Sequence, residues 1–173
     1  MILRLFQKSS STQNLTNIKL ETSMQIIPFT KQGYEELKKQ LDSIISQRPE
    51  AVKELTRGRD MGDLSENGLY KAAKQNLVDI DRQIRHLKNL VKYGKPNLPT
   101  SKEFVQLGHK VLVEGEKGLK EFRIVGEFEA NPKENMISLK SPIGHNLMGR
   151  KTGDEININT PKGIIKYLIK KIS

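Results

Sequence analysis

The strongest constraint on the fold is a pair of apolar stripes that flank one short segment, residues 62–67 (Gly-Asp-Leu-Ser-Glu-Asn). Within each stripe, apolar residues recur every three or four positions, which places them on one helix face and favours a left-handed helix pair. The segment is too short for anything but a tight reversal, so we expect antiparallel neighbours. At ~1.5 Å per residue, helices of about 27 residues form a hairpin roughly 40 Å long. The stripes comprise Tyr34, Leu37, Leu41, Ile44, Ala51 and Leu55 before the segment, and Tyr70, Ala73, Leu77, Ile80, Ile84, Leu87 and Val91 after it.

The first predicted helix begins near Thr30, whose hydroxyl is suited to an N-cap. Pro49 is an obstacle within it, because a proline in a helix interior removes a backbone hydrogen bond and costs ~3 kcal/mol. The apolar register nevertheless continues across the proline, from Ile44 to Ala51. Arg48 is the one polar member of this stripe. We therefore expect one kinked helix rather than two.

Two carboxylates, Asp63 and Glu66, lie at the predicted tip of the hairpin. Three positions apart at the start of a helix, they share one face. One interpretation makes them helix-start residues, with Ser65 as N-cap and the acids favoured by the positive end of the helix dipole. The other makes them metal ligands. Mg²⁺ prefers about six oxygen ligands, so two carboxylates form an incomplete site that another macromolecule would have to complete.

Cations flank the predicted tip and continue along the second helix. Those near the tip are Arg57, Arg59, Lys71 and Lys74. They are consistent with a solvated surface, and equally with a surface that attracts phosphate. The formal net charge of +10 indicates attraction to polyanions, either nucleic acid or an acidic protein surface, or serves solubility alone.

Residues 94–100, Gly-Lys-Pro-Asn-Leu-Pro-Thr, end the helical pattern and predict an extended linker. Beyond Val105 the pattern changes to short β-like runs separated by turn residues. Residues 141–149 are entered through Ser-Pro and predict a short helix. We therefore expect an α+β chain in which a small antiparallel sheet wraps on one helix. The predicted strands are residues 110–114, 121–126, 136–138, 155–159 and 164–172.

Composition and motifs exclude several kinds of chemistry. The chain has no cysteine, which rules out disulfides and thiolate zinc sites. No apolar run approaches the ~18 residues of a membrane span, so we expect a soluble protein without a membrane partner. No glycine-rich phosphate loop, His-Glu-x-x-His motif or nucleophile elbow occurs. The acidic pair at the tip is thus the one credible chemical element.

Residues 1–23 precede the predicted hairpin and differ from it in composition. Their only acid is Glu21, and they include a run of three serines. An acid-poor, weakly amphipathic leader of this kind is one form of an organellar transit peptide. A disordered extension and an upstream start codon are the other interpretations. We expect a cytoplasmic protein, or an organellar one if this segment is a transit peptide.

The tip and several further motifs resemble one family. Residues 62–74, Gly-Asp-Leu-Ser-Glu-Asn-Gly-Leu-Tyr-Lys-Ala-Ala-Lys, resemble the tip of the Gre-type transcript cleavage factors (the GreA/GreB family) of bacterial RNA polymerase. The resemblance extends from residue 24 to residue 172, with motifs of both halves in the right order. The other matching segments are residues 24–30, 48–50, 123–126, 137–138, 141–143 and 160–163.

This resemblance implies a division of the chain into four parts. Residues 1–23 are an extension, disordered or targeting; residues 24–94 are a coiled-coil hairpin with an acidic tip; residues 95–100 are a linker. Residues 101–173 form an FKBP-like domain that docks on polymerase. The implied function is a transcription elongation factor that binds the secondary channel of RNA polymerase. There it stimulates the polymerase's own cleavage of backtracked RNA and rescues arrested complexes, as a cofactor rather than an enzyme.

The resemblance also assigns roles to individual residues. Asp63 and Glu66 would help to hold a Mg²⁺ ion shared with polymerase, Arg59 and Lys74 would approach the nascent RNA 3′ end, and Ser141 and Pro142 would contact polymerase. The free protein would bind no metal stably. We further expect a monomer, and a DNA contact in the complex.

Two departures from the family pattern bear on the tip and on docking. Gly68-Leu69 replaces an alanine and an acid, which loosens the tip helix by ~1 kcal/mol. Lys140 stands where the GreB branch tends to carry an acid.

Two alternative functions stay open. One is an inhibitor that binds the same channel, although both tip acids are retained. The other is a basic nucleic-acid-binding module, which predicts salt-sensitive binding to free RNA or DNA.

Overall fold

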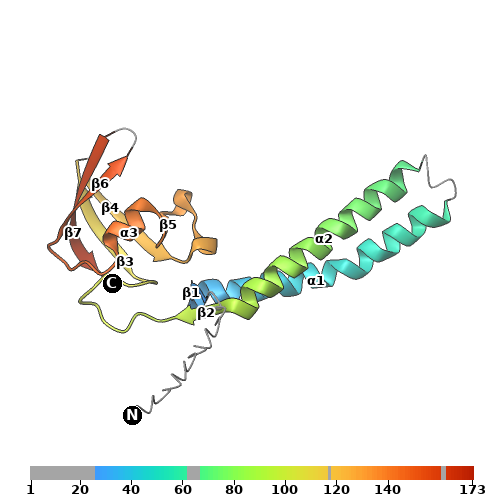
Figure 1. Cartoon of the computed structure of the whole chain (residues 1–173), viewed down its shortest axis with the longest axis horizontal. Coiled ribbons are helices and arrows are strands. Elements are labelled where there is room, and N and C mark those ends of the chain that lie inside the picture. Colours follow the sequence, from blue (N-terminus) through green and yellow to red (C-terminus); the bar gives the residue numbers. More distant parts are fainter. Residues whose placement is uncertain (1–25, 62–66, 117, 161–162) are drawn as a thin grey trace, which may run out of the picture.

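The structure is a computed structural model that describes residues 26–61, 67–116, 118–160 and 163–173. A long two-helix hairpin projects from one side of a small sheet domain (Figure 1). Among the helices that the structure describes, none combines the length and the apolar character needed to cross a membrane.

Helix α1 (Lys31–Asp60) begins where the sequence predicts. The Thr30 hydroxyl accepts a hydrogen bond from the Gly33 N–H at 3.0 Å, which makes Thr30 the N-cap. Pro49 lies inside the helix, which continues without interruption on both sides of it. Ala51, just beyond the proline, is buried against the partner helix. The prediction of one helix across Pro49 is therefore confirmed.

Helix α2 (Gly68–Tyr93) returns antiparallel to α1 (Figure 1), which confirms the predicted hairpin. Two apolar clusters hold the helices together, and four of their six buried members belong to the predicted stripes: Leu37, Ala51, Ile80 and Ile84. The cluster at the base is Phe29, Leu37 and Leu90, and the cluster midway along the rod is Ala51, Ile80 and Ile84. The N-cap of α2 is Asn67, two residues later than Ser65.

Two short strands close the base of the hairpin. Strand β1 (Ile27–Thr30) pairs in parallel with β2 (Gly94–Asn97), and Ile27 lies opposite Gly94. The sequence predicts only an extended linker over residues 94–100. The hairpin brings the segment before α1 beside the segment after α2, and their extended backbones then pair. This pairing depends on the tertiary fold, so the local sequence of either segment does not indicate it.

The C-terminal part forms a five-stranded sheet in the order β5-β4-β3-β7-β6. Its strands are β3 (Lys110–Gly115), β4 (Gly118–Val125), β5 (Met136–Ser138), β6 (Glu155–Thr160) and β7 (Gly163–Ile172). Helix α3 (Pro142–Leu147) packs on this sheet, and its Leu147 side chain is fully buried. The α+β class with a helical hairpin and a small sheet domain is thus confirmed.

The sheet is mixed rather than wholly antiparallel as predicted, because β5 pairs in parallel with β4. Between these strands the chain makes two short 3-10 turns, η1 (Glu127–Glu129) and η2 (Pro132–Glu134). Asn135 then adopts a left-handed conformation with φ of 56°. The turns act as a short crossover and let β5 enter in the same direction as β4. A strand pattern alone does not specify this direction.

Candidate functional site

The predicted catalytic pair, Asp63 and Glu66, belongs to residues 62–66 and lies outside the residues that the structure describes. The structure describes instead the two helix ends that this segment joins. α1 ends at Asp60 and α2 begins at Gly68, both at the end of the hairpin that is remote from the sheet domain (Figure 1).

Asn67 ties the two helices together immediately after the tip segment. Its side-chain oxygen accepts a hydrogen bond from the Tyr70 N–H at 3.0 Å, which caps α2. Its side-chain amide donates to the Gly58 carbonyl of α1 at 2.7 Å. Gly58 is buried, and a Cβ there would lie 3.0 Å from the Tyr70 Cα, so a glycine permits this close helix contact. Asparagine and serine are about equally good N-cap residues, so cap propensity alone did not distinguish Asn67 from Ser65.

An apolar groove of about 530 Å³ lies between the helices beside the tip. Met61 and Leu69 line it, and both are exposed, at 68% and 63%. Ala72 and Ala73 line it as well, and their side chains are short. Leu69 occupies a position where the family pattern has an acid, so this groove is more apolar than that pattern implies.

The predicted RNA-approaching cations lie on different helices. Arg59 is in the last turn of α1, and its Nε is 3.9 Å from the Asp60 carboxylate. Lys74 is exposed on α2, about 9 Å along the helix axis from Gly68 at ~1.5 Å per residue. An exposed ion pair of this length holds a side chain only weakly. Both cations are thus free to reorient toward an anion.

Midway along the rod, Arg48 and Asp81 form a two-pronged ion pair. The Arg48 Nε lies 2.7 Å from Asp81 Oδ1, and its Nη2 lies 3.3 Å from Oδ2. Hydrogen bonding to Arg48 lowers the pKa of the Asp81 carboxyl, and the charges of Arg48 and Arg85 add to that effect. Arg48 is the polar member of the apolar stripe. Its two-pronged contact with Asp81 favours one axial register of α1 against α2.

The predicted polymerase-binding residues form the start of α3. The Ser141 hydroxyl accepts from the Gly144 N–H at 3.0 Å and donates to the Ser138 carbonyl at 2.7 Å. Pro142 follows as the first helical residue and is exposed. Lys140, just before them, pairs with Glu127 at 2.5 Å. Ser141 thus shapes the loop internally, whereas Pro142 presents its ring to solvent.

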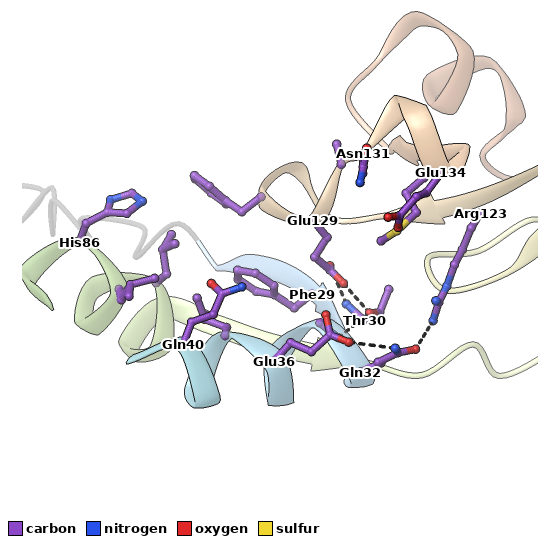
Figure 2. Close-up of a pocket in the computed structure, with 17 residues that line it drawn as sticks. Phe29, Thr30, Gln32, Glu36, Gln40, His86, Arg123, Glu129, Asn131 and Glu134 are labelled. Atoms are coloured by element: carbon purple, nitrogen blue, oxygen red, sulfur yellow. Dashed lines mark hydrogen bonds between the residues drawn. The ribbon is translucent and has the colours of Figure 1, made fainter. Parts of the chain in front are cut away.

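A polar cleft of about 480 Å³ separates the hairpin base from the sheet domain, and its side chains are drawn in Figure 2. The Glu129 carboxylate accepts hydrogen bonds from the Thr30 N–H at 2.9 Å, from the Thr30 hydroxyl and from the Gly126 N–H at 3.0 Å. Arg123 donates to Gln32 at 2.9 Å. Thr30 and Glu129 are 99 residues apart, and no local sequence signal indicates this junction.

Among the residues that the structure describes, no cluster of three or more His, Cys, Asp or Glu side chains could hold a metal ion. The described residues thus provide anchoring, charge and an apolar groove around the tip.

The comparisons with known proteins cover both halves of the chain. Residues 27–94 match the family described as "Transcription elongation factor, N-terminal", and residues 100–173 match "Transcription elongation factor, GreA/GreB, C-term". Among similar curated proteins is the transcription elongation factor GreA of Wigglesworthia glossinidia brevipalpis, 37% identical over 157 residues. That alignment covers 87% of this chain and 99% of the relative. The protein of the same name from Nautilia profundicola is 39% identical over 150 residues, and that alignment covers 84% of this chain and 93% of the relative.

Among solved structures, GreA factor homolog 1 of Thermus thermophilus is 30% identical, with a TM-score of 0.41 and coverage of 85% of this chain and 98% of that one. The family matches carry the assignment, because together they span the hairpin and the sheet domain in the order found here. With both halves matched and relatives aligned over nearly their whole length, the chain belongs to the GreA/GreB family of transcription elongation factors.

Proposed function

We propose that this chain is a transcript cleavage factor that enters the secondary channel of a bacterial-type RNA polymerase and stimulates cleavage of backtracked RNA. The observation that carries this proposal is the hairpin itself. Residues 62–66, with both acids of the family motif, join helix ends that lie far from the sheet domain. A rod about 40 Å long, estimated from ~1.5 Å per residue, can carry such a tip into a deep channel.

The two parts of the chain have different tasks in this proposal. The sheet domain binds the polymerase surface through the exposed Pro142 and its loop. The hairpin carries the acids to the RNA 3′ end. The free chain acts as a monomer and as a cofactor of polymerase, whose active site performs the reaction.

Asp63 and Glu66 are the residues that would hold Mg²⁺. Their carboxylate oxygens are the ligands that this ion prefers, so the donor set fits, although it is too small to complete the ion's coordination. When bound, the ion would supply positive charge that activates water and stabilises the leaving oxygen. Asn67 supports this role, because it is covalently next to Glu66 and its own side chain is bonded to both helices.

Arg59 and Lys74 would attract the RNA phosphates as the tip approaches the 3′ end. Both are exposed and weakly restrained, so they can follow a mobile chain of phosphates. Their attraction falls as salt rises, because it is electrostatic.

The test is RNA cleavage in halted elongation complexes, with and without the protein. Asp63→Asn and Glu66→Gln each remove one charge and keep the shape of the side chain. We expect stimulated cleavage to fall at least roughly tenfold, the scale of losing a charge that stabilises a transition state. Competition for polymerase should change little. Glu54→Gln is the matched control, because Glu54 is an exposed carboxylate of α1 that lines the groove beside the tip, and we assign it no role in the reaction.

Other outcomes contradict the proposal. Equal losses of binding and cleavage in the tip variants would make the acids docking residues. Tight binding without any cleavage by the unaltered chain would indicate a channel inhibitor. Salt-sensitive binding to free RNA in the absence of polymerase, with no effect on halted complexes, would indicate a nucleic-acid-binding module.

A further inference from the structure

Three consecutive residues of the turn η1 contact two parts of the molecule, the segment before α3 and the base of the hairpin. Glu127 pairs with Lys140, which precedes the exposed Pro142 loop. Phe128 lies against the base of the hairpin, with ring centroids 6.3 Å from Phe29 and 6.1 Å from His86. Glu129 accepts the hydrogen bonds from Thr30 described above. One short turn thus connects the loop assigned to docking with the start of the hairpin.

The Glu129 contact completes the N-terminus of α1 from another domain. In a capping box, the side chain of the third helical residue accepts a hydrogen bond from the N–H of the N-cap residue. The third helical residue of α1 is Gly33, which has no side chain, and Glu129 of the sheet domain accepts from the Thr30 N–H in its place. A negative charge at this position is also favoured by the helix dipole.

The absence of a side chain at Gly33 makes this arrangement possible. A Cβ built on Gly33 would lie 1.8 Å from Glu129 Oε1, so the carboxylate occupies the space that a side chain would need. On the other side of the junction, a Cβ on Gly126 would lie 2.3 Å from the Pro28 carbonyl oxygen. The hairpin base and η1 therefore fit together at close range from both sides.

We propose that η1 is a bracket that fixes the direction of the hairpin relative to the docking loop, with Glu129 as its positioning residue. The need for such a device follows from the length of the rod. Helix α1 has 30 residues. At ~1.5 Å per residue it is about 45 Å long, so a rotation of ~10° at the base moves the far end by roughly 8 Å. A displacement of this size would remove the tip from any reacting group. This consequence for cleavage rests on the proposed function, whereas the bracket itself does not.

The bracket is tested first without polymerase. The chain has no cysteine, so Gln75→Cys on α2 and Asn157→Cys on β6 give two unique spin-label sites on exposed residues. We expect a narrow distribution of distances between the two spin labels in the otherwise unaltered chain. The distribution should be clearly broader in Glu129→Ala. Gly33→Ala should broaden it as well, because its methyl group displaces the carboxylate while alanine favours the helix. Circular dichroism verifies that both variants remain folded.

The matched control is Glu134→Ala. Glu134 lines the same cleft and carries the same charge, yet among the described residues its side chain has no hydrogen bond or ion pair with the hairpin. The distance distribution of the Glu134→Ala variant should equal that of the unaltered chain. Equal distributions for Glu129→Ala, Gly33→Ala and the unaltered chain would overturn the bracket.

The positioning role is then tested by RNA cleavage in halted elongation complexes. We expect Glu129→Ala to lower the saturated cleavage rate about three- to tenfold, while the concentration for half-maximal effect changes less than about twofold. A broadened distribution with an unchanged saturated rate would overturn the positioning role. If the unaltered chain stimulates no cleavage, the proposed function fails instead, and the distance distributions alone decide the bracket.

Discussion

At the scale of single residues, Asn67 shows how one side chain can organise the frame of a functional tip. An asparagine side chain offers an acceptor and a donor at once. Asn67 uses the acceptor to cap its own helix and the donor to reach the Gly58 carbonyl of the opposite helix. An isolated cap would fix only α2, whereas this residue also fixes the spacing of the two helix ends.

Asn67→Ala removes both bonds, and we expect the hairpin to lose about 1–2 kcal/mol of unfolding free energy, the combined scale of an N-cap and a partly exposed hydrogen bond. Asn67→Asp should cost less, because aspartate keeps the cap and loses only the donor to Gly58. Urea unfolding followed by helical circular dichroism measures both changes. Equal stability of the alanine variant and the unaltered chain would show that the tip frame does not depend on this residue.

At the scale of elements, the two helices of the hairpin are joined by apolar packing at two levels and, beside the middle cluster, by the ion pair of Arg48 with Asp81. The base and middle clusters exclude water. Arg48 and Asp81 add a geometric constraint, because their two-pronged contact is satisfied at one axial register only. The ion pair is largely exposed, so it contributes to alignment more than to stability.

The lowered pKa of Asp81 gives this contact a defined pH dependence. A carboxyl whose pKa is lower in the folded state contributes stability above its unfolded value, near 3.9, and loses it as pH falls through the folded value. We therefore expect Asp81→Asn to lower the melting temperature slightly at pH 7. The difference between variant and unaltered chain should shrink by pH 3. A difference that stays constant between these pH values would show that the ion pair does not cause it.

The elements also show which parts of the fold local sequence can predict. The hairpin was predictable because its stripe residues recur at helical spacing, and five strands were predictable from their apolar runs and turns. The pairing of β1 with β2, the parallel direction of β5 and the bond from Glu129 to Thr30 were not. Each of these depends on which distant segments meet once the hairpin has formed. At the candidate site, Arg59, Lys74, Ser141 and Pro142 were named from motifs, while the acids remain outside the described residues.

At the scale of the whole molecule, the protein consists of a sheet domain, which carries the proposed docking loop, and a rod that projects from it (Figure 1). Ser141 is bonded within the loop, which leaves Pro142 as the exposed residue of the pair. Proline at the first helical position fixes the backbone before any partner binds, so little conformational entropy is lost on docking.

Pro142→Ala should therefore raise the concentration needed for half-maximal cleavage and leave the saturated rate unaltered. Pro132→Ala is the matched control, because Pro132 begins η2 of the same domain and is not part of the docking loop. Titration of halted complexes with each variant separates the two parameters. A lower saturated rate with unchanged affinity would contradict the assignment of Pro142 to docking.

The bare Cα of Gly33 has a consequence for exchanging parts between members of the family. A hairpin grafted from a relative would bring its own third helical residue to the junction. Any side chain there would compete with the Glu129 carboxylate for the same space, because a Cβ alone would lie 1.8 Å from it. Each grafted half would keep its own apolar core and fold, yet the two would no longer meet at the same angle. The chain is therefore modular in its cores but not at its junction, where residues 33 and 129 have to be exchanged together.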